Sequence, residues 1–236
     1  KKKGIKVFYY IAPKVWAWKE KRVHRLRKYV DKLFIIFPFE IEYFKKWGIN
    51  AIYRGNPLLD SVDNFKYAHE NRDEFCNRCK VNPDKPIIAL LAGSRRGEIN
   101  YLLPRMAKIV DHYPDYQFIL AGAPATETEI YKSVLDKFGI RLLLENELSE
   151  QNDCTADSNN SNNSNNSNNS NNSNKRQTIK LLKGETYSIL KHAKAAIISS
   201  GTASLEAALI GTPQVVCYGG NEISYRIAKQ FVKLKY

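Results

Sequence analysis

Gly93, Ser94 and Arg95 form a short segment whose residue types suit the binding of a phosphate group. The two small residues let a ligand approach the backbone, and a guanidinium can donate two hydrogen bonds to phosphate oxygens. The segment lies between an apolar run that begins at Ile87 and a helical pattern that begins at Ile99. The alternative interpretation is that Arg95 is an ordinary surface arginine with a solvated head group.

A second segment, Ser200-Gly201-Thr202, also joins a predicted strand to a predicted helix. Small residues at the start of a helix leave its first N–H groups accessible, and the helix dipole places partial positive charge there. A diphosphate fits that environment. Glu206 follows one turn later, where its carboxylate could accept hydrogen bonds from two ribose hydroxyls. Alternatively, Gly201 only permits a tight turn, and Glu206 is an acid placed favourably in the first turn of a helix.

The elements that must position these segments alternate between short apolar runs and helical patterns. Such alternation is typical of a parallel sheet with right-handed crossovers, so the fold class is α/β. The two segments, together with Ala-Gly-Ala-Pro at 121–124, are expected at the carboxyl edge of one sheet. Predicted strands cover 5–11, 33–37, 51–53, 87–92, 117–121, 141–145, 178–182, 195–199 and 214–218. Predicted helices cover 18–29, 40–47, 67–79, 99–112, 127–138, 186–192, 202–210 and 224–232.

Turn residues at Gly55, Asn56 and Pro57 divide this alternation into two series, which predicts one domain over residues 1–60 and another over 61–236. The first series holds about three strands, fewer than a doubly wound sheet normally has, and it starts directly on a strand. We therefore expect an incomplete first lobe and a chain truncated at its N-terminus. A Ser-Asn-Asn repeat over 158–174 contains no apolar side chain and predicts a disordered insertion at about 150–176.

Composition narrows the class of protein without identifying a partner. The 37 basic and 24 acidic residues give a net charge of +13, which favours a phosphorylated substrate, a nucleic acid or an anionic membrane face. No run approaches the roughly 18 apolar residues of a membrane span, and no signal-peptide pattern is present, so a cytoplasmic protein is expected. Cys76 and Cys79 have the spacing of half a zinc site, but no second pair completes four ligands, which favours free thiols.

Several motifs for phosphate and metal binding are absent from the sequence. No Gly-x-Gly-x-x-Gly follows a predicted strand, and Gly97 is not followed by the Lys-Ser/Thr of a P-loop. No Asp-x-Asp could hold a metal against a diphosphate, and neither Gly-x-Ser-x-Gly nor His-Glu-x-x-His occurs. The predicted site therefore has to bind phosphate with an arginine and a helix start, and neither a metal nor another cofactor is expected.

Six segments in sequence order resemble motifs of the lipid-A-disaccharide synthases. Together they extend over nearly the whole chain apart from the Ser-Asn-Asn repeat, which makes the set far more specific than any one segment. They are Tyr-Tyr-Ile-Ala-Pro-Lys-Val-Trp-Ala-Trp at 9–18, Pro-Phe-Glu at 38–40, Gly-Asn-Pro-Leu-Leu-Asp at 55–60, Gly-Ser-Arg at 93–95 with Glu-Ile at 98–99, Ala-Gly-Ala-Pro at 121–124 and Ser-Gly-Thr-Ala-Ser-Leu-Glu at 200–206. Where that family often has histidine and proline, this chain has Asn56 and Ala92.

The resemblance implies a GT-B architecture, in which two Rossmann-type lobes face each other across a cleft. It also implies a glycosyltransferase that joins UDP-2,3-diacylglucosamine to 2,3-diacylglucosamine 1-phosphate (lipid X), with inversion and without a metal. The products would be lipid A disaccharide 1-phosphate and UDP. Because lipid A anchors bacterial lipopolysaccharide, the resemblance further implies a cytoplasmic protein associated peripherally with the inner membrane. It leaves the oligomeric state open.

The same resemblance implies that the second lobe binds the donor nucleotide. Arg95 would stabilise the leaving UDP, Thr202 would face its diphosphate, and Glu206 would bind the ribose. The family's proposed catalytic acid lies upstream of Lys1, so no general base is assigned and the chain alone is expected to be inactive. The predicted substrate-binding residues are Gly93, Ser94, Arg95, Gly122, Ser200, Gly201, Thr202, Glu206, Tyr218 and Asn221.

A basic amphipathic pattern begins at the predicted helix over 18–29. Its apolar stripe comprises Val23, Leu26, Val30 and Leu33, and its basic stripe comprises Lys21, Arg25, Lys28 and Lys32. In one interpretation the basic stripe attracts anionic lipid, and Trp16, Trp18 and Phe39 are interfacial anchors. In the other, the apolar stripe packs on the core while the charges are solvated.

Two further function classes remain open from the sequence. A nucleic-acid-binding protein is favoured by the charge and the 11% aromatic content, but no RNP, KH or helix-turn-helix signature is present. The other class is a UDP-sugar enzyme of the same architecture, either an epimerase or a transferase with a soluble acceptor. The salt dependence of nucleic-acid binding, and a comparison of UDP-diacylglucosamine with UDP-GlcNAc, would discriminate among these classes.

Overall fold

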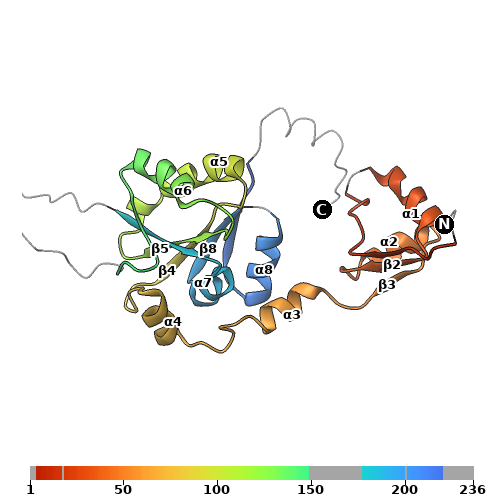
Figure 1. The fold of residues 1–236 in the computed structure, drawn as a ribbon, viewed down its shortest axis with the longest axis horizontal. Helices are drawn as coiled ribbons and strands as arrows, with labels where there is room; N and C mark the ends of the chain where they lie inside the picture. The colour runs from red at the N-terminus through yellow and green to blue at the C-terminus, as the bar shows by residue number, and fades with distance from the viewer. Residues whose placement is uncertain (1–3, 18, 149–176, 200, 220–236) are drawn as a thin grey trace, which may run out of the picture. The chain divides into compact units, whose positions relative to one another are not determined.

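The computed structural model describes residues 4–17, 19–148, 177–199 and 201–219, which fall into two compact units. The described residues up to Lys66 belong to the first unit, and Tyr67–Gly219 form the second. Each unit contains a parallel sheet of its own (Figure 1). The Ser-Asn-Asn repeat, Trp18 and the predicted helix at 224–232 lie outside the described residues.

The first unit is a three-stranded parallel sheet in the order β1-β2-β3, with helices between the strands. Its strands are β1 (Phe8–Tyr10), β2 (Lys32–Ile35) and β3 (Ala51–Tyr53). A 3-10 turn (Glu20–Arg22) and α1 (Val23–Tyr29) connect the first two strands, and α2 (Glu40–Lys46) connects the next two. Apolar side chains of both helices pack with the sheet in one small core.

The predicted basic helix is shorter than the sequence pattern indicates. Lys19 adopts a left-handed backbone conformation with φ 55° just before the 3-10 turn, and α1 ends at Tyr29. Lys32 and Leu33 belong to strand β2, so their placement on a helical stripe was wrong. Val23, at 0% exposed, is buried in the core of the first unit. That burial supports the packing interpretation of the apolar stripe.

A helix that the sequence reading missed follows the predicted turn at Gly55–Pro57. Helix α3 spans Pro57–Asp63, and the Asn56 side chain accepts a hydrogen bond of 3.1 Å from the Leu58 amide. Proline suits the first position of a helix because that position needs no N–H donor. The turn residues were thus a helix cap, and Asn56, where the resembled family often has histidine, has a structural role here.

The second unit is a six-stranded sheet in the order β6-β7-β5-β4-β8-β9, and every neighbouring pair is parallel. The nine predicted strands are all found, with boundaries shifted by a few residues. Those of the second unit are β4 (Ile87–Leu91), β5 (Gln117–Gly122), β6 (Arg141–Leu143), β7 (Thr178–Lys183), β8 (Ala195–Ser199) and β9 (Gln214–Cys217). Its helices are α4 (Arg72–Cys79), α5 (Arg96–Ala107), α6 (Thr128–Leu135), α7 (Thr186–His192) and α8 (Thr202–Ile210), with 3-10 turns at Val110–His112 and Asp136–Phe138.

Helices cover both faces of this second sheet (Figure 1). Ile88 and Leu90 of β4 pack in the core that includes α5 and α6, whereas Ile87 and Ala89 pack in the core that includes α4, α7 and α8. Successive side chains of a strand point to opposite faces, so a strand covered on both faces is apolar throughout. The expected α/β class is confirmed. Among the described helices, none has the length and apolarity needed to cross a bilayer.

Helix α4 begins five residues later than the predicted start at Tyr67. Asn71 caps it: its side chain accepts from the Glu74 amide at 2.9 Å, and the Glu74 carboxylate accepts from the Asn71 amide at 2.9 Å. A reciprocal capping box satisfies two helix-end donors at once and fixes the first residue of the helix. The helical pattern before Asn71 was therefore misread.

Cys76 and Cys79 are free thiols that point into the apolar core of the second unit. Burial raises the pKa of Cys79 from 9.0 to about 11. Among the described residues, no group of three or more His, Cys, Asp or Glu side chains could hold a metal ion.

We expect Cys76 and Cys79 to resist alkylation by iodoacetamide at pH 8 in the folded protein. Because the pKa of Cys79 is raised from 9.0 to about 11, the fraction of Cys79 present as the reactive thiolate is about 100-fold smaller. Peptide mass spectrometry should show much faster labelling of the half-buried Cys217, and urea should remove the difference. Rapid labelling of both buried thiols before unfolding would contradict this placement.

Candidate functional site

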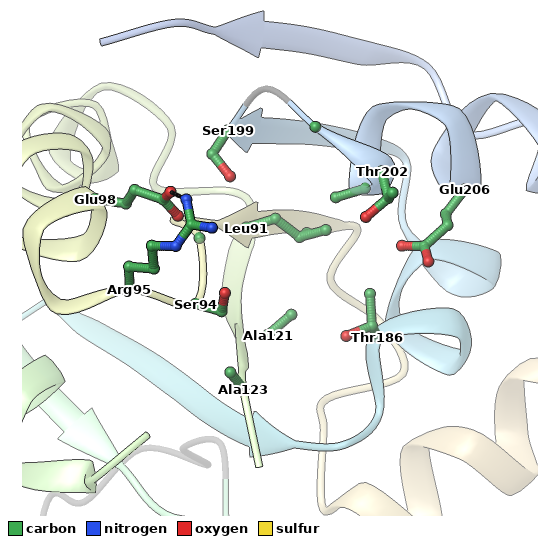
Figure 2. A pocket seen from close by; sticks show the side chains of 13 residues that line it. Leu91, Ser94, Arg95, Glu98, Ala121, Ala123, Thr186, Ser199, Thr202 and Glu206 are labelled. Carbon is green, nitrogen blue, oxygen red and sulfur yellow. Dashed lines mark hydrogen bonds and ion pairs between the residues drawn. The ribbon is translucent and has the colours of Figure 1, made fainter. Parts of the chain in front are cut away.

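A pocket of about 340 Å³ lies at the carboxyl edge of the second sheet (Figure 2). It opens beside β4 and β8, which are neighbouring interior strands of the sheet. Its walls come from the segments that follow β4, β5, β7 and β8. The lining residues are Leu91, Gly93, Ser94, Arg95, Glu98, Ala121, Ala123, Thr186, Ser199, Gly201, Thr202, Ala203 and Glu206.

The segment between β4 and α5 supplies one wall of the pocket. Gly93 has φ 96°, a backbone conformation that favours glycine, and a side chain there would also displace the Glu98 carboxylate, whose Oε2 lies too close to the position of an added Cβ. Helix α5 starts at Arg96, three residues earlier than predicted, which makes Arg95 its N-cap residue. Arg95 offers no side-chain acceptor to the helix start. The Thr126 hydroxyl donates to the Ser94 carbonyl at 3.2 Å and braces the segment from the β5 side.

The segment between β8 and α8 supplies the opposite wall. Gly201 is the N-cap of α8 with φ 132° and ψ −150°, a conformation that is essentially restricted to glycine. No side chain caps this helix start, so its first N–H groups lack the side-chain acceptor that Asn71 provides for α4. Thr202 and Ala203 from this first turn line the pocket. The arrangement suits an anion.

Glu206 lies beyond the first turn of α8, which contains no acidic residue. The interpretation of Glu206 as a stabilising first-turn acid is therefore wrong. Its Oε1 accepts a hydrogen bond of 3.1 Å from the Tyr187 hydroxyl. Burial, together with the Glu206 charge, raises the pKa of Tyr187 to about 12, so Tyr187 remains a donor at neutral pH. This hydrogen bond orients a carboxylate at the pocket wall.

Arg95 lines the same pocket, where its guanidinium pairs with Glu98 rather than standing free. The Nη1–Oε1 distance is 3.1 Å, and the two side chains are 84% and 37% exposed. Exposed ion pairs of this kind contribute little stability, so a bound phosphate could replace Glu98 as the partner of Arg95 at small cost. The sequence reading did not anticipate Glu98 as a lining residue.

The structure brings together most of the predicted site residues. Gly93, Ser94 and Arg95 meet Gly201, Thr202 and Glu206 in one pocket, and Ser200 and Asn221 lie outside the described residues. Two predicted residues, Gly122 and Tyr218, are not among those that line it. A side chain at Gly122 would collide with Leu181 on β7, which gives this glycine a packing role. Tyr218 is 73% exposed after β9.

Thr186 and Ser199 also line the pocket, although neither was among the predicted substrate-binding residues. Thr186 is the first residue of α7, and Ser199 is the last residue of β8. Both follow from the rule that carboxyl ends of parallel strands share one edge, since Thr186 follows the predicted strand at 178–182 and Ser199 ends the predicted strand at 195–199. The predicted strand ends were therefore enough to indicate both residues as candidates for the pocket.

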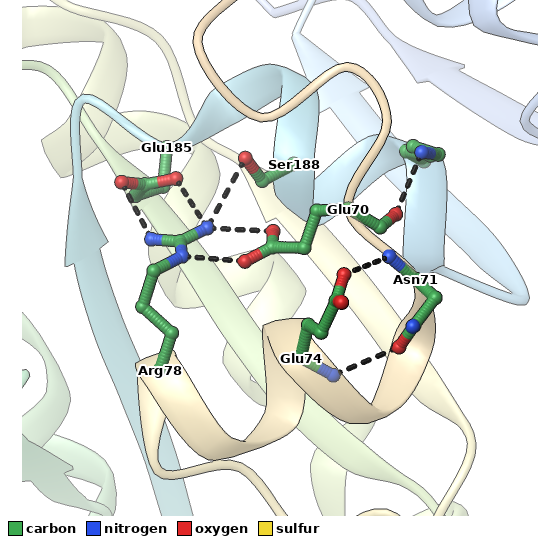
Figure 3. A network of polar contacts seen from close by, with 7 residues as sticks. Glu70, Asn71, Glu74, Arg78, Glu185 and Ser188 are labelled. Carbon is green, nitrogen blue, oxygen red and sulfur yellow. Dashed lines mark hydrogen bonds and ion pairs between the residues drawn. The ribbon is translucent and has the colours of Figure 1, made fainter.

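A partly buried ion-pair network fixes the start of α7, next to the pocket (Figure 3). The Arg78 guanidinium contacts Glu70 at 2.6 Å and Glu185 at 2.9 Å, and it stacks 3.6 Å from the centroid of the Tyr67 ring. Glu185 is the N-cap residue of α7 and directly precedes Thr186. Arg78 is thus a structural residue that connects α4 with the element carrying Thr186.

The fold and the pocket define the second unit as an α/β protein of Rossmann type with a candidate ligand site at the carboxyl edge of its sheet. A family model described as "Lipid-A-disaccharide synthetase" matches residues 1–161 and 127–236. The chain belongs to the lipid-A-disaccharide synthase family.

Relatives carrying the name lipid-A-disaccharide synthase match the whole chain. The protein of Syntrophus aciditrophicus is 32% identical over 99% of this chain and 52% of its own length. That of Sulfurihydrogenibium sp. is 34% identical over 100% of this chain and 55% of its own length. The chain thus spans about half the length of these relatives. A solved structure of UDP-GlcNAc 2-epimerase from Methanocaldococcus jannaschii gives a TM-score of 0.48 at 17% identity, over 87% of this chain and 56% of that one.

Proposed function

We propose that the pocket of the second unit binds the UDP moiety of a nucleotide-sugar donor. One observation carries the proposal: the guanidinium of Arg95 and the uncapped start of α8 line the same pocket. A cation and a set of unpaired N–H groups are the two devices that hold a diphosphate without a metal. The pocket volume of about 340 Å³ is within the range of small-molecule sites.

Within this proposal each predicted residue has a distinct role. Gly93 and Gly201 let the diphosphate approach the backbone, and Arg95 offsets the negative charge that develops on the departing UDP. Glu206, oriented by Tyr187, accepts hydrogen bonds from the ribose hydroxyls. Neither Gly122 nor Tyr218 lines the pocket, so this proposal does not use them.

We further propose the reaction of the complete protein. It transfers 2,3-diacylglucosamine from UDP to 2,3-diacylglucosamine 1-phosphate, with inversion at the anomeric carbon and without a metal, at the cytoplasmic face of the inner membrane. Family membership supports this proposal. The first unit would belong to the acceptor side and the second to the donor side. No residue of this chain is assigned as the general base.

Isothermal titration with UDP tests the proposed site. We expect Arg95→Ala to weaken UDP binding by roughly 10- to 100-fold, because one charge-assisted hydrogen bond contributes about 1.5–3 kcal/mol. Removing Arg95 also leaves the Glu98 carboxylate in the pocket without its ion-pair partner, which would repel the diphosphate. Arg96→Ala is the matched control, since Arg96 is an exposed neighbour outside the pocket lining and carries the same charge.

Glu206→Gln tests the ribose role in the same titration. Glutamine can keep a hydrogen bond with Tyr187 but loses the carboxylate charge, so we expect UDP affinity to fall by about tenfold. The variant should lose less affinity for 2′-deoxy-UDP than for UDP. If Arg95→Ala and Glu206→Gln both bind UDP as the unsubstituted chain does, the assigned roles are wrong.

A second titration separates the proposed donor from the alternatives. Tighter binding of UDP-diacylglucosamine than of UDP-GlcNAc would support the lipid donor. Equal binding would favour an enzyme that uses soluble sugars. Failure to bind any UDP compound, together with salt-dependent binding of RNA or DNA, would favour a nucleic-acid-binding protein instead.

A further inference from the structure

A second cluster of chemically distinctive side chains lies in the first unit, at the carboxyl ends of β1 and β2. The Lys14 ammonium sits 3.6 Å from the centroid of the Phe37 ring and 5.9 Å from that of Trp16. Lys14 and Trp16 follow β1, and Phe37 follows β2, which pairs with β1 in parallel. The carboxyl ends of parallel strands are where such sheets bind ligands.

The aromatic rings of this cluster form a continuous, partly open surface. Phe37 and Phe39 are stacked with centroids 5.6 Å apart, and Trp16 meets Phe39 edge-on at 5.1 Å. Phe39 is 54% exposed. A large apolar ring that is held in place by two others and still faces solvent is suited to cover the apolar face of a ligand.

The buried carboxylate beside the cluster braces its two segments. Glu40 is 1% exposed; its Oε1 accepts from Trp16 Nε1 at 3.0 Å, and its Oε2 accepts from the Phe37 amide at 3.2 Å. Within the described part of the chain, Lys14 has no carboxylate within the 4.0 Å of an ion pair. Lys14 thus has ring contacts but lacks an anionic partner at bonding distance.

The electrostatics of Lys14 agree with this geometry. Lys14 is an exposed residue, and the partial burial of its ammonium beside the rings lowers its pKa, while the charge of Glu40 opposes that shift. A second cation, the exposed Arg54, follows β3 at the same edge, because β3 pairs with β2 in parallel. A phosphate placed at Lys14 would supply the missing counter-charge.

We propose that Lys14, together with the Trp16, Phe37 and Phe39 rings, forms a binding site for a phosphorylated sugar on the first unit. The phosphomonoester would pair with the Lys14 ammonium, and the apolar face of the sugar would lie on the exposed Phe39 ring. The choice of a sugar phosphate rests on the proposed function, in which the acceptor is a hexosamine 1-phosphate. The water-soluble sugar phosphate and its acylated, membrane-borne form present the same chemistry to these residues.

Titration of the full chain with glucosamine 1-phosphate tests this site, with binding followed by calorimetry and by phosphorus NMR of the ligand. We expect Lys14→Gln to weaken binding at least about tenfold, as for the loss of a hydrogen bond to a charged group. Lys14→Arg should retain most of the affinity. Lys45→Gln is the matched control, because Lys45 lies in the same unit with its side chain 76% exposed.

Three further ligands test which part of the sugar phosphate these residues recognise. Glucosamine without phosphate should bind much more weakly, and inorganic phosphate should bind more weakly than the sugar phosphate. An acylated glucosamine 1-phosphate in detergent micelles should show the same dependence on Lys14 as the soluble probe if the lipid-linked form is the source. Equal affinity for inorganic phosphate and for the sugar phosphate would contradict the proposed contact between the sugar and the Phe39 ring. Equal affinity of Lys14→Gln and the unsubstituted chain would overturn the site.

UDP titration of the same samples keeps this inference separate from the proposed function. Lys14→Gln should bind UDP normally. If UDP binds normally but the sugar phosphate shows no binding that depends on Lys14, the site at Lys14 is wrong and the proposed UDP pocket stands. Lys14-dependent binding of the sugar phosphate without UDP binding would leave this site standing and remove the proposed donor pocket.

Discussion

Replacing Arg78 with methionine is expected to lower the free energy of unfolding by about 2 kcal/mol, because it leaves two partly buried carboxylates without their charged hydrogen-bond partner. The Arg78 side chain is 27% exposed, and its two partners, Glu70 and Glu185, are 7% and 20% exposed. Methionine preserves much of the apolar stem but none of the donors. Urea denaturation followed by circular dichroism measures the difference.

The pH dependence of this loss distinguishes the ion pair from simple packing. The hydrogen bonds from Arg78 are the largest cause of a lowered pKa at Glu70, whose ordinary value is 4.5. A lowered pKa in the folded state contributes stability above the ordinary value, and that stability disappears as the pH falls through the folded-state pKa. The gap in stability between the unsubstituted chain and Arg78→Met should therefore be widest near neutral pH and narrow below about pH 4.5.

Arg141→Met is the matched control for this experiment. Arg141 also pairs with a glutamate in the second unit, at 3.0 Å from Glu147, but these side chains are 51% and 40% exposed. Exposed pairs contribute at most about 1 kcal/mol, so the control should lose far less stability. Comparable losses for Arg78→Met and Arg141→Met, or a gap that does not change with pH, would contradict the network in Figure 3.

Gly201→Ala is expected to reduce UDP affinity by about tenfold or more. The φ of 132° and ψ of −150° at this N-cap lie where a residue with a side chain is strained by about 1–3 kcal/mol. Among the described residues other than its chain neighbours, no atom lies within 4 Å of the position an added Cβ would occupy, so the effect is expected to come from the backbone. The segment would relax to another conformation and move the first N–H groups of α8 away from the pocket.

Gly97→Ala is the control for Gly201→Ala. Gly97 lies within α5 and does not have a positive φ, and within the described part of the chain no non-neighbouring atom lies within 4 Å of an added Cβ. Alanine in a helix is more stable than glycine by up to about 1 kcal/mol, so Gly97→Ala should bind UDP normally and be slightly more stable. Unchanged UDP binding by Gly201→Ala would show that the backbone at this N-cap is not part of the site.

The alternation of apolar runs and helical patterns was sufficient to predict the α/β class and, within the described residues, each of the strands. Strands such as β4 are apolar throughout because both faces are covered, and that pattern is local. Helix starts were less predictable. The α4 start depends on a reciprocal cap at Asn71, and α3 begins at a cap that the sequence reading took for a turn.

The candidate site was also largely visible in the sequence, since Gly93, Arg95, Gly201 and Glu206 stand where strands end and helices begin. Only the tertiary structure decided which of these residues meet, because parallel pairing of β4 with β8 brings together segments that are about a hundred residues apart in the chain. The hydrogen bond from Tyr187 to Glu206 likewise joins two helices, α7 and α8, that follow different strands of the sheet. Such contacts depend on the order of strands in the sheet, which local residue patterns do not encode.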